Sequence, residues 1–186
     1  RLGDAWGGAQ VHAALLGPGA PGSGGALAQR GADRVWVMTH PRLTPPAAEV
    51  MLGVLEQLVR QTAPSVVLLP HDLLGAEIGP RLAYRLGTGV ITDCVGFEAG
   101  TGPGAMRWVR PTHGGKALAR MTAAGPIQAA TIRARAFEPL PANPARRGEV
   151  STFDLDLAAL PERVSVVEEI AHAAEGISLD QAQIIV

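Results

Sequence analysis

The sequence predicts an α/β protein with helices on both faces of a mixed sheet, whose first half is parallel and second half antiparallel. Up to residue 93, short apolar runs alternate with helical patterns, which is typical of parallel crossovers; after it, short runs follow one another around glycine-rich turns. Aromatic residues make up only 4% of the chain, so small aliphatic side chains must form the core. A chain of 186 residues suits one domain and buries roughly 70% of its unfolded surface without disulfides or metal.

Four apolar runs in the first half are predicted to be buried strands. They are VHAALL at 11–16, RVWVM at 34–38, SVVLL at 65–69 and GVIT at 89–92. The run at 65–69 has no polar alternation, so both of its faces should be covered. Between the first two strands, residues 26–30 leave room for one short helix, which Gly31 ends.

Two longer helices are predicted between the later strands. The first has Thr44 as N-cap, Pro45 in its first turn and Glu49 near its positive end, and it stops before Pro64. The second covers 75–87 and ends at Gly87. Both carry an apolar stripe at helical spacing, formed by Val50, Val54, Leu55, Leu58 and Val59 in the first and by Ile78, Leu82 and Leu86 in the second.

The second half is predicted to contain short strands and a connector. Residues 95–111 should form an antiparallel hairpin, and 117–123 and 127–134 two further strands around a Gly125-Pro126 turn. The predicted organisation is one α/β domain over 1–148, then a connector and last strand over 149–186. A proline-rich stretch is expected at 139–148, at the end of the domain. A strand at 163–170 and a turn or short helix from Ser178 are expected after it.

Charge and cysteine content exclude several classes of function. Sixteen Lys and Arg against seventeen Asp and Glu give a net charge of −1 without a basic run, so no nucleic-acid partner is expected. No stretch reaches the ~20 apolar residues of a membrane span, and no membrane insertion is expected. Cys94 is the only cysteine, which favours a reducing compartment. Residues 1–8 are typical of a last helical turn rather than a signal peptide, and both ends indicate a fragment.

Several residue types that often carry chemistry have an ordinary interpretation here. The glycine-rich segment 17–25 is compatible with a phosphate cradle, but it lacks a P-loop lysine and GxGxxG spacing, so a mobile loop is favoured. Cys94 is expected to be a small buried residue. The histidines are scattered and predict no metal site; they are His12, His40, His71, His113 and His172. No catalytic residues are predicted.

Two loops at strand ends remain as candidate sites. In the first, His71 and Asp72 follow a buried strand, and Thr92 and Asp93 end the next one. Open α/β sheets bind ligands at this edge. In the second, RPTHGGK at 110–116, a Gly-Gly pair permits a bend that other residues resist. The bend would direct Arg110 and Lys116 towards one point.

The loop at 110–116 has two interpretations of equal weight. It consists of Arg110, Pro111, Thr112, His113, Gly114, Gly115 and Lys116. One interpretation is a cationic binding loop, in which the planar fork of the arginine holds a carboxylate or backbone carbonyls. The other is a tight connection between two strands.

Four segments in order resemble the N-terminal domain of the electron transfer flavoprotein alpha subunit. They are GADRV at 31–35, LLPHDLLGAEIGPRLAYRLGTGVITD at 68–93, RPTHGGKALA at 110–119 and PIQAATIRARAFEP at 126–139. The ending ISLDQAQIIV at 177–186 is similar to the segment that precedes the FAD-binding domain of that family. The resemblance implies a three-layer, Rossmann-like fold of the adenine nucleotide alpha hydrolase type.

The resemblance also implies a function for the whole protein. The alpha subunit pairs with a beta subunit, FAD is bound mainly by a C-terminal domain beyond these residues, and AMP or a second FAD is expected in the beta subunit. Electrons pass from dehydrogenases, such as acyl-CoA dehydrogenases, to a quinone oxidoreductase or another acceptor. The chain is then a non-catalytic carrier subunit that binds no FAD by itself. The expected location is the bacterial cytoplasm or another reducing compartment such as the mitochondrial matrix.

The resemblance places residues 110–116 near the junction of the subunits and the flavin domain. The chain departs from the family pattern there, because His113 replaces an aromatic residue and Lys116 an asparagine. The first strand and most of the first helix of the family are also missing, so the sheet is expected to lack one central strand. Two alternatives stay open: a stand-alone adenine-nucleotide-binding module that uses 17–25 or the His71 loop, and a structural domain whose nucleotide cleft is vestigial.

Overall fold

The computed structural model describes residues 2–44, 47–100, 105–156, 158, 160, 163–164, 166–168, 170 and 182. The helices are α1 (Leu2–Ala5), α2 (Ala20–Gln29), the 3₁₀ turn η1 (Pro41–Leu43), α3 (Ala48–Thr62), α4 (Leu73–Arg85) and the 3₁₀ turn η3 (His113–Gly115). The strands are β1 (His12–Leu16), β2 (Arg34–Met38), β3 (Val66–Pro70), β4 (Val90–Cys94), β5 (Gly96–Glu98), β6 (Arg107–Thr112), β7 (Ala117–Met121), β8 (Gln128–Ile132) and β9 (Glu149–Thr152).

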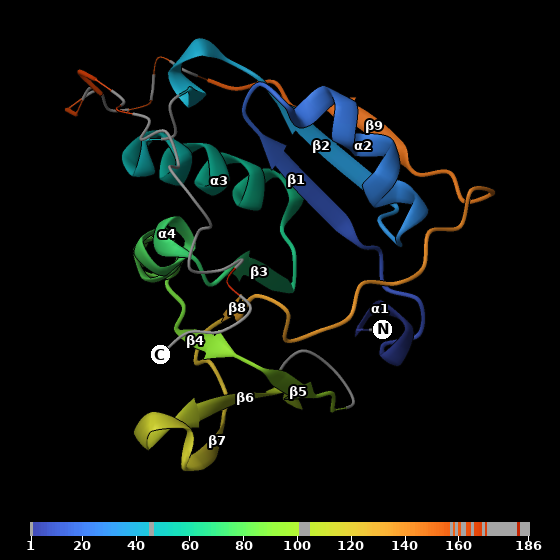
Figure 1. The fold of residues 1–186 in the computed structure, drawn as a ribbon, viewed down its shortest axis with the longest axis vertical. Coiled ribbons are helices and arrows are strands. Elements are labelled where there is room, and N and C mark those ends of the chain that lie inside the picture. The colour runs from blue at the N-terminus through green and yellow to red at the C-terminus, as the bar shows by residue number, and fades with distance from the viewer. Residues whose placement is uncertain are drawn as a thin grey trace.

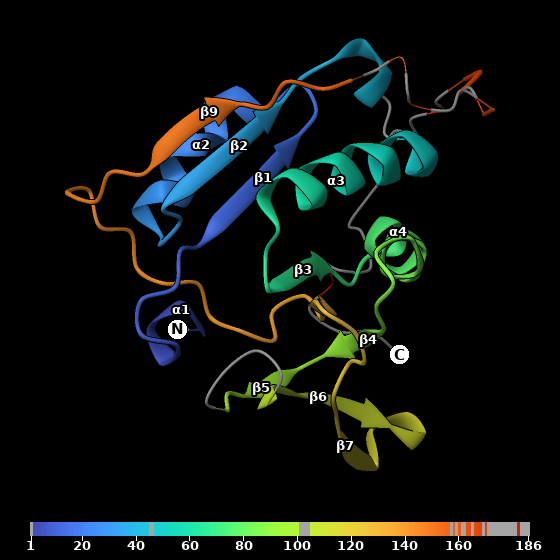
Figure 2. The ribbon, with the colours of Figure 1, turned by 180° about the vertical axis from the view of Figure 1, so that it is seen from behind.

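The predicted α/β class, with parallel and antiparallel strands and helices on both faces, is confirmed. Strands β1, β2 and β9 form one parallel sheet in the order β1-β2-β9, and β3, β8 and β4 form a second in the order β3-β8-β4. Strands β5, β6 and β7 form an antiparallel sheet at the far end of the molecule (Figures 1 and 2). The described strands therefore form three separate sheets rather than the single continuous sheet that was expected.

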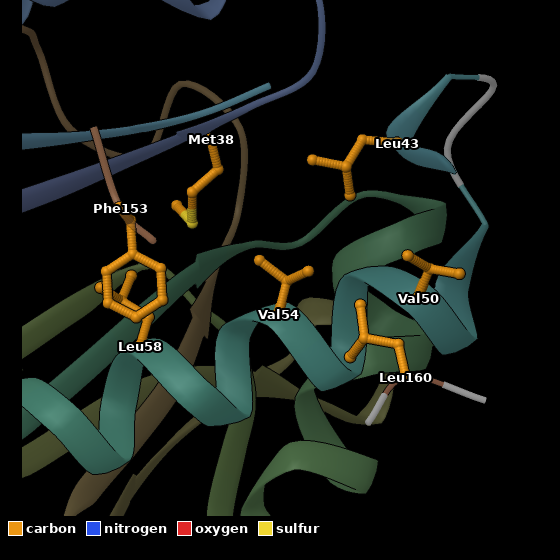
Figure 3. Close-up of a cluster of buried hydrophobic side chains, with 7 residues drawn as sticks. All are labelled: Met38, Leu43, Val50, Val54, Leu58, Phe153 and Leu160. Atoms are coloured by element: carbon orange, nitrogen blue, oxygen red, sulfur yellow. The ribbon is translucent and has the colours of Figure 1, made fainter. Parts of the chain in front are cut away.

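The side chains of β2 alternate between two cores, one on each face of the sheet β1-β2-β9. Val35 and Val37 pack with Ala20 of α2 on one face, and Met38 lies on the other face with Val54 of α3 (Figure 3). Because successive strand residues point to opposite faces, a β-branched and aromatic strand such as β2 is buried from both sides only when helices cover both. This gives the three layers α2, sheet and α3.

Helix α3 also covers the second parallel sheet together with α4. Leu52 of α3 packs against Ile78 and Leu82 of α4, and Val67 and Leu69 of β3 contact the same cluster. One long helix thus contributes to the cores of both parallel sheets, which lie on either side of it in Figures 1 and 2.

Strands β1 and β3 are edges of their sheets. Among the described residues, β1 is paired only with β2 and β3 only with β8. The prediction that both faces of 65–69 are covered is wrong for Leu68, which is 48% exposed.

The ends of α3 follow local chemistry only in part. The helix stops at Thr62, as expected for a helix that runs up to Pro64. Ala63 adopts a left-handed conformation with φ 43°, which is common at helix C-termini. Glu49 lies in the first turn as predicted. The prediction of Thr44 as N-cap is wrong, because Thr44 ends η1 and Ala47 occupies the N-cap position without a side-chain hydrogen bond. Pro45 lies outside the described residues.

Helix α2 corrects the interpretation of the glycine-rich segment. The helix predicted at 26–30 begins at Ala20, so residues 20–25 form its first turns instead of a mobile loop. The reason is packing against β9: a Cβ on Gly24 would lie 2.9 Å from a methyl group of Val150. Glycine lets helix α2 approach the half-exposed Val150 closely, although its intrinsic helix propensity is poor.

Strand β8 corrects the predicted topology of the second half. Residues 128–132 do not pair with 117–121 as neighbours in an antiparallel arrangement; they insert between β3 and β4, parallel to both. The four residues Gln128 to Thr131 are buried, as is usual for a central parallel strand. The hairpin predicted at 95–111 is confirmed by the antiparallel pairing of β5 with β6.

The C-terminal part differs from the prediction as well. Strand β9, just past the predicted domain boundary at residue 148, was not predicted; it pairs with β2, and an ion pair joins Arg34 to Glu149. The described residues within 163–170, where a strand was predicted, form none, and residues 165 and 169 lie outside the described residues. The turn from Ser178 and His172 lie outside the described residues. None of the described helices is long and apolar enough to cross a membrane.

Candidate functional site

A pocket of about 490 Å³ opens where β4, β6 and β8 end. Its lining comes from both predicted loops and from the residue that follows β8; the residues are Asp93, Arg110, Pro111, Thr112, His113, Gly114, Gly115 and Arg133. Strands β4 and β8 are parallel, so their carboxyl ends meet at one edge, where open α/β sheets bind ligands. The structure therefore joins Asp93 and residues 110–115 in one site.

A bulge in β4 positions Asp93. The pairing of β4 with β8 shifts register between Ile91 and Cys94, and Asp93 has a left-handed φ of 61°. Its backbone N–H donates to Oγ1 of Thr131 over 3.0 Å. The same hydroxyl forms a 2.8 Å hydrogen bond with Nδ1 of His71. Because Thr131 is fully buried, one hydroxyl group holds both the bulge and the histidine ring in place.

Arg133 neutralises Asp93 through two parallel hydrogen bonds. Its Nε donates to Oδ1 over 2.8 Å and its Nη2 to Oδ2 over 2.6 Å, which is the bidentate geometry of strong charge-assisted pairs. This hydrogen bonding is the main cause that lowers the pKa of Asp93, against an opposing contribution from burial, and the charges of Arg133, His71 and Arg110 act in the same direction. The same hydrogen bonds raise the pKa of Arg133.

Replacement of Asp93 with asparagine should make the free energy of unfolding less dependent on pH in the acid range. A carboxyl whose pKa is lower in the folded state stabilises the fold above its unfolded pKa, and this contribution is lost as the pH falls through the folded value. The ordinary pKa of an aspartate side chain is about 3.9, and the pKa of Asp93 is lower than this in the folded chain. Urea unfolding of wild type and Asp93→Asn should give a constant difference above about pH 5 that shrinks below pH 3.8.

Arg133→Gln serves as the matched variant for this test, because it removes the main cause of the lowered pKa of Asp93. It should remove the same pH dependence. A difference between wild type and Asp93→Asn that stays constant down to pH 2 would contradict the assignment.

Arg110 is held in the pocket wall by a hydroxyl group, and no described carboxylate forms an ion pair with it. Its Nη1 donates to Oγ1 of Thr92 over 3.1 Å. Its Nε is shielded from solvent and has no hydrogen-bond partner in the described part of the chain. The backbone N–H of Val95 donates to the carbonyl of Val109 over 2.8 Å and fixes β6, and with it Arg110, beside the end of β4.

The turn between β6 and β7 forms the rim of the pocket. His113, Gly114 and Gly115 have left-handed φ values of 51°, 65° and 87°, so the bend predicted at the Gly-Gly pair is present. Thr112 pairs with Ala117 across it. Added Cβ atoms on either glycine would meet nothing within 4 Å. The turn is thus a tight strand connection that also borders a pocket, and the two interpretations of this loop are compatible.

The remaining predicted site residues lie outside the pocket. Lys116 is exposed and is absent from the lining. Asp72 caps α4, accepting a 2.7 Å hydrogen bond from the N–H of Gly75. Thr92 and His71 do not line the pocket themselves. Thr92 accepts a hydrogen bond from Arg110, and His71 forms one with Thr131.

Sequence reasoning missed Arg133 and Thr131. The signal that could have identified them is a position at the carboxyl end of a parallel strand, and it becomes visible only once 128–132 is recognised as parallel.

Cys94 has no role in the chemistry of the pocket. The residue is fully buried, as predicted, and burial raises the pKa of its thiol to about 11. It therefore stays protonated near neutral pH, unlike a nucleophilic thiolate. Among the described residues, no group of three or more His, Cys, Asp and Glu could hold a metal ion.

Comparisons with known proteins agree on one family. The family described as "Electron transfer flavoprotein domain" matches residues 1–158. The electron transfer flavoprotein subunit alpha of Bacillus subtilis is 31% identical over 177 residues, covering 95% of this chain and 53% of that protein. Protein FixB of Azotobacter vinelandii is 32% identical over 151 residues, covering 79% of this chain and 42% of that protein.

One further relative is named as a subunit of a dehydrogenase. The lactate dehydrogenase (NAD(+),ferredoxin) subunit LctC of Acetobacterium woodii is 29% identical over 177 residues, covering 95% of this chain and 42% of that protein. The chain thus spans about half the length of the curated relatives that it matches.

Proposed function

Because this chain belongs to the electron transfer flavoprotein family, as the N-terminal part of an alpha subunit, we propose that it is the scaffold domain of an electron-carrying heterodimer. In this role it pairs with a beta subunit and supports a flavin domain, while FAD carries the electrons. The family match over residues 1–158, to relatives of about twice the length, supports this proposal most directly.

The proposed electron path begins at dehydrogenases, such as acyl-CoA dehydrogenases of fatty acid oxidation, and ends at a quinone oxidoreductase or another acceptor. We assign FAD to a C-terminal domain outside these residues and AMP or a second FAD to the beta subunit. No catalytic residue of this chain takes part, which is consistent with the protonated, buried state of its only cysteine. We place the protein in a reducing compartment such as the bacterial cytoplasm, because that cysteine has no partner for an internal disulfide.

Residues 110–116 are proposed to contact the beta subunit or the flavin domain. The support is geometric: η3 is exposed at the end of the β6–β7 hairpin, beside the pocket. Loops with binding roles are commonly held in this way by a rigid scaffold, here the sheet β5-β6-β7.

The substitution Gly115→Val should weaken assembly with the beta subunit. Gly115 has φ 87°, and a non-glycine residue in left-handed geometry costs about 1–2 kcal/mol, so the turn should change shape. Titration of the chain with the beta subunit should give at least a tenfold lower affinity.

Gly87→Val is the matched control, since Gly87 has φ 65° and lies at the end of α4, away from this turn, and an added Cβ there would meet nothing within 4 Å. It should leave the affinity for the beta subunit unchanged. Equal affinities of wild type and Gly115→Val would remove the turn from the interface.

The alternative is a stand-alone adenine-nucleotide-binding module. The observation in its favour is the pocket at the carboxyl ends of β4 and β8, with two arginines in its wall. Titration with the beta subunit separates the two functions: an electron-carrying scaffold assembles with the beta subunit, whereas a stand-alone nucleotide module binds AMP and has no affinity for that subunit.

A further inference from the structure

The charges in the pocket do not balance. Arg133 is fully engaged by Asp93 through two hydrogen bonds. Arg110 forms no ion pair with any described carboxylate, and its one hydrogen bond goes to the neutral hydroxyl of Thr92. Two guanidinium groups thus face one carboxylate in the pocket lining, which leaves one positive charge uncompensated.

An uncompensated guanidinium in this position is unusual. Arg110 is half-buried, and its Nε–H is shielded from water without a hydrogen-bond acceptor among the described residues. Buried donors in proteins are nearly always paired, and an unpaired one calls for an explanation. A charged group removed from water is costly unless an opposite charge is present. An acceptor that does not belong to the described chain would resolve both problems.

The shape and lining of the pocket indicate the chemistry of that acceptor. Its volume of about 490 Å³ is within the range of about 300–1,000 Å³ that small-molecule sites occupy. Five of the eight lining residues have polar or charged side chains, and Pro111 is the clearest apolar member. Gly114 and Gly115 place no side chain at the rim, and space around them is open. Such a pocket is suited to a small, charged and hydrated group.

We propose that this pocket is an oxyanion-binding site, in which Arg110 pairs with a carboxylate or a phosphate group. The planar guanidinium matches both oxyanions through paired N–H donors. Thr92 holds one arm of the side chain, so little conformational freedom is lost on binding. Asp93 keeps Arg133 in the wall and prevents the pocket from carrying two free positive charges.

Two sources can supply the oxyanion, and they predict different results. A free phosphate, alone or as part of AMP, would bind to the chain without any partner. An acidic side chain of the beta subunit would enter the pocket only on assembly; this second source rests on the proposed function.

Calorimetric titration of the 186-residue chain with inorganic phosphate and with AMP, at constant ionic strength, tests the first source. We expect Arg110→Gln to weaken binding at least tenfold. Arg107→Gln is the matched control, because it removes the same charge from an exposed residue of the same strand, outside the pocket lining. It should change the affinity less than twofold. Equal binding by wild type and Arg110→Gln would place the ligand elsewhere and overturn the site for free phosphates.

Titration of the same variants with the beta subunit tests the second source. If a partner carboxylate fills the pocket, Arg110→Gln weakens the heterodimer at least tenfold, Arg107→Gln does not, and the beta subunit displaces any bound phosphate. The proposal is overturned if wild type shows no Arg110-dependent binding of phosphate or AMP and if Arg110→Gln assembles as tightly as wild type. In that case an intact heterodimer still supports the proposed function, whereas failure of wild type to assemble counts against that function alone.

Discussion

Gly75→Ala should lower the free energy of unfolding by about 3 kcal/mol, because overpacking against rigid structure costs about 1–3 kcal/mol and loss of an N-cap a further ~1 kcal/mol. Gly75 is buried in the first turn of α4. A Cβ at this position would overlap the carbonyl oxygen of Pro70 and lie 3.0 Å from its carbonyl carbon. Both atoms belong to the backbone, so no side-chain rotation can relieve the contact. Helix α4 would have to move away from β3.

That movement would also strain the cap of the helix. The N–H of Gly75 donates to Oδ1 of Asp72 over 2.7 Å, and a displaced first turn lengthens this hydrogen bond. Urea unfolding followed by circular dichroism measures the combined loss.

Gly25→Ala is the matched control. Gly25 lies within α2, and an added Cβ would meet nothing within 4 Å. Alanine in place of glycine within an unobstructed helix should stabilise the protein by about 0.5–1 kcal/mol. If Gly75→Ala were as stable as wild type, the result would contradict the argument that an added Cβ overlaps the backbone of Pro70.

Trp108→Ala should cost about 3–5 kcal/mol, the range for removal of a large aromatic side chain from a core. Trp108 of β6 is fully buried and packs with Ile91 and Cys94 of β4 and Ala130 of β8. It also lies edge-on to Phe97, with ring centroids 6.3 Å apart. This side chain therefore attaches the antiparallel sheet to the parallel one, and its loss leaves a cavity between the two.

Trp108→Phe separates the packing of this residue from its polarity. The indole Nε1 is buried without a hydrogen-bond partner among the described residues, so phenylalanine removes an unpaired donor while keeping most of the ring. We expect its cost to be less than half that of Trp108→Ala in the same urea experiment. Equal losses for the two variants would contradict the packing argument.

Trp108→Ala should also affect the pocket. Trp108 and Arg110 stand two residues apart on β6, so their side chains leave the strand on the same side. A cavity under Trp108 therefore loosens the support of Arg110. The oxyanion affinity of the folded variant should fall along with its stability.

Much of the fold could be predicted from local patterns. The apolar stripe and the Ala63-Pro64 step predicted where α3 runs and ends, and Ile78 and Leu82 identified the buried face of α4. These signals are local, because helical hydrogen bonds join residues four apart and a cap depends on its immediate neighbours. The first half of the chain, which alternates short strands with helices, was therefore largely accessible to prediction.

Strand pairing was less accessible for a physical reason. Residues 128–132 are apolar enough to be a strand, but the sequence of this segment does not determine which strands it pairs with or in which direction. The small side chains of Ala129 and Ala130, both buried, fit between β3 and β4, and this fit exists only in the folded chain. Strand β9 was missed because EVST is short and polar and gains its place from β2 and Gly24.

The amino-acid sequence by itself determined the class of fold, the two long helices and a left-handed turn at Gly114-Gly115, since each depends on residues close together in the chain. Only the tertiary structure decided that Asp93, Arg110 and Arg133 share one pocket. It also decided that the second cation in the lining, beside Arg110, is Arg133 rather than Lys116. Asp93 and Arg133 are 40 residues apart, and they meet because β8 inserts beside β4. Contacts of this kind follow from which strands pair and how closely their side chains pack, and these depend on the whole core rather than on any one segment.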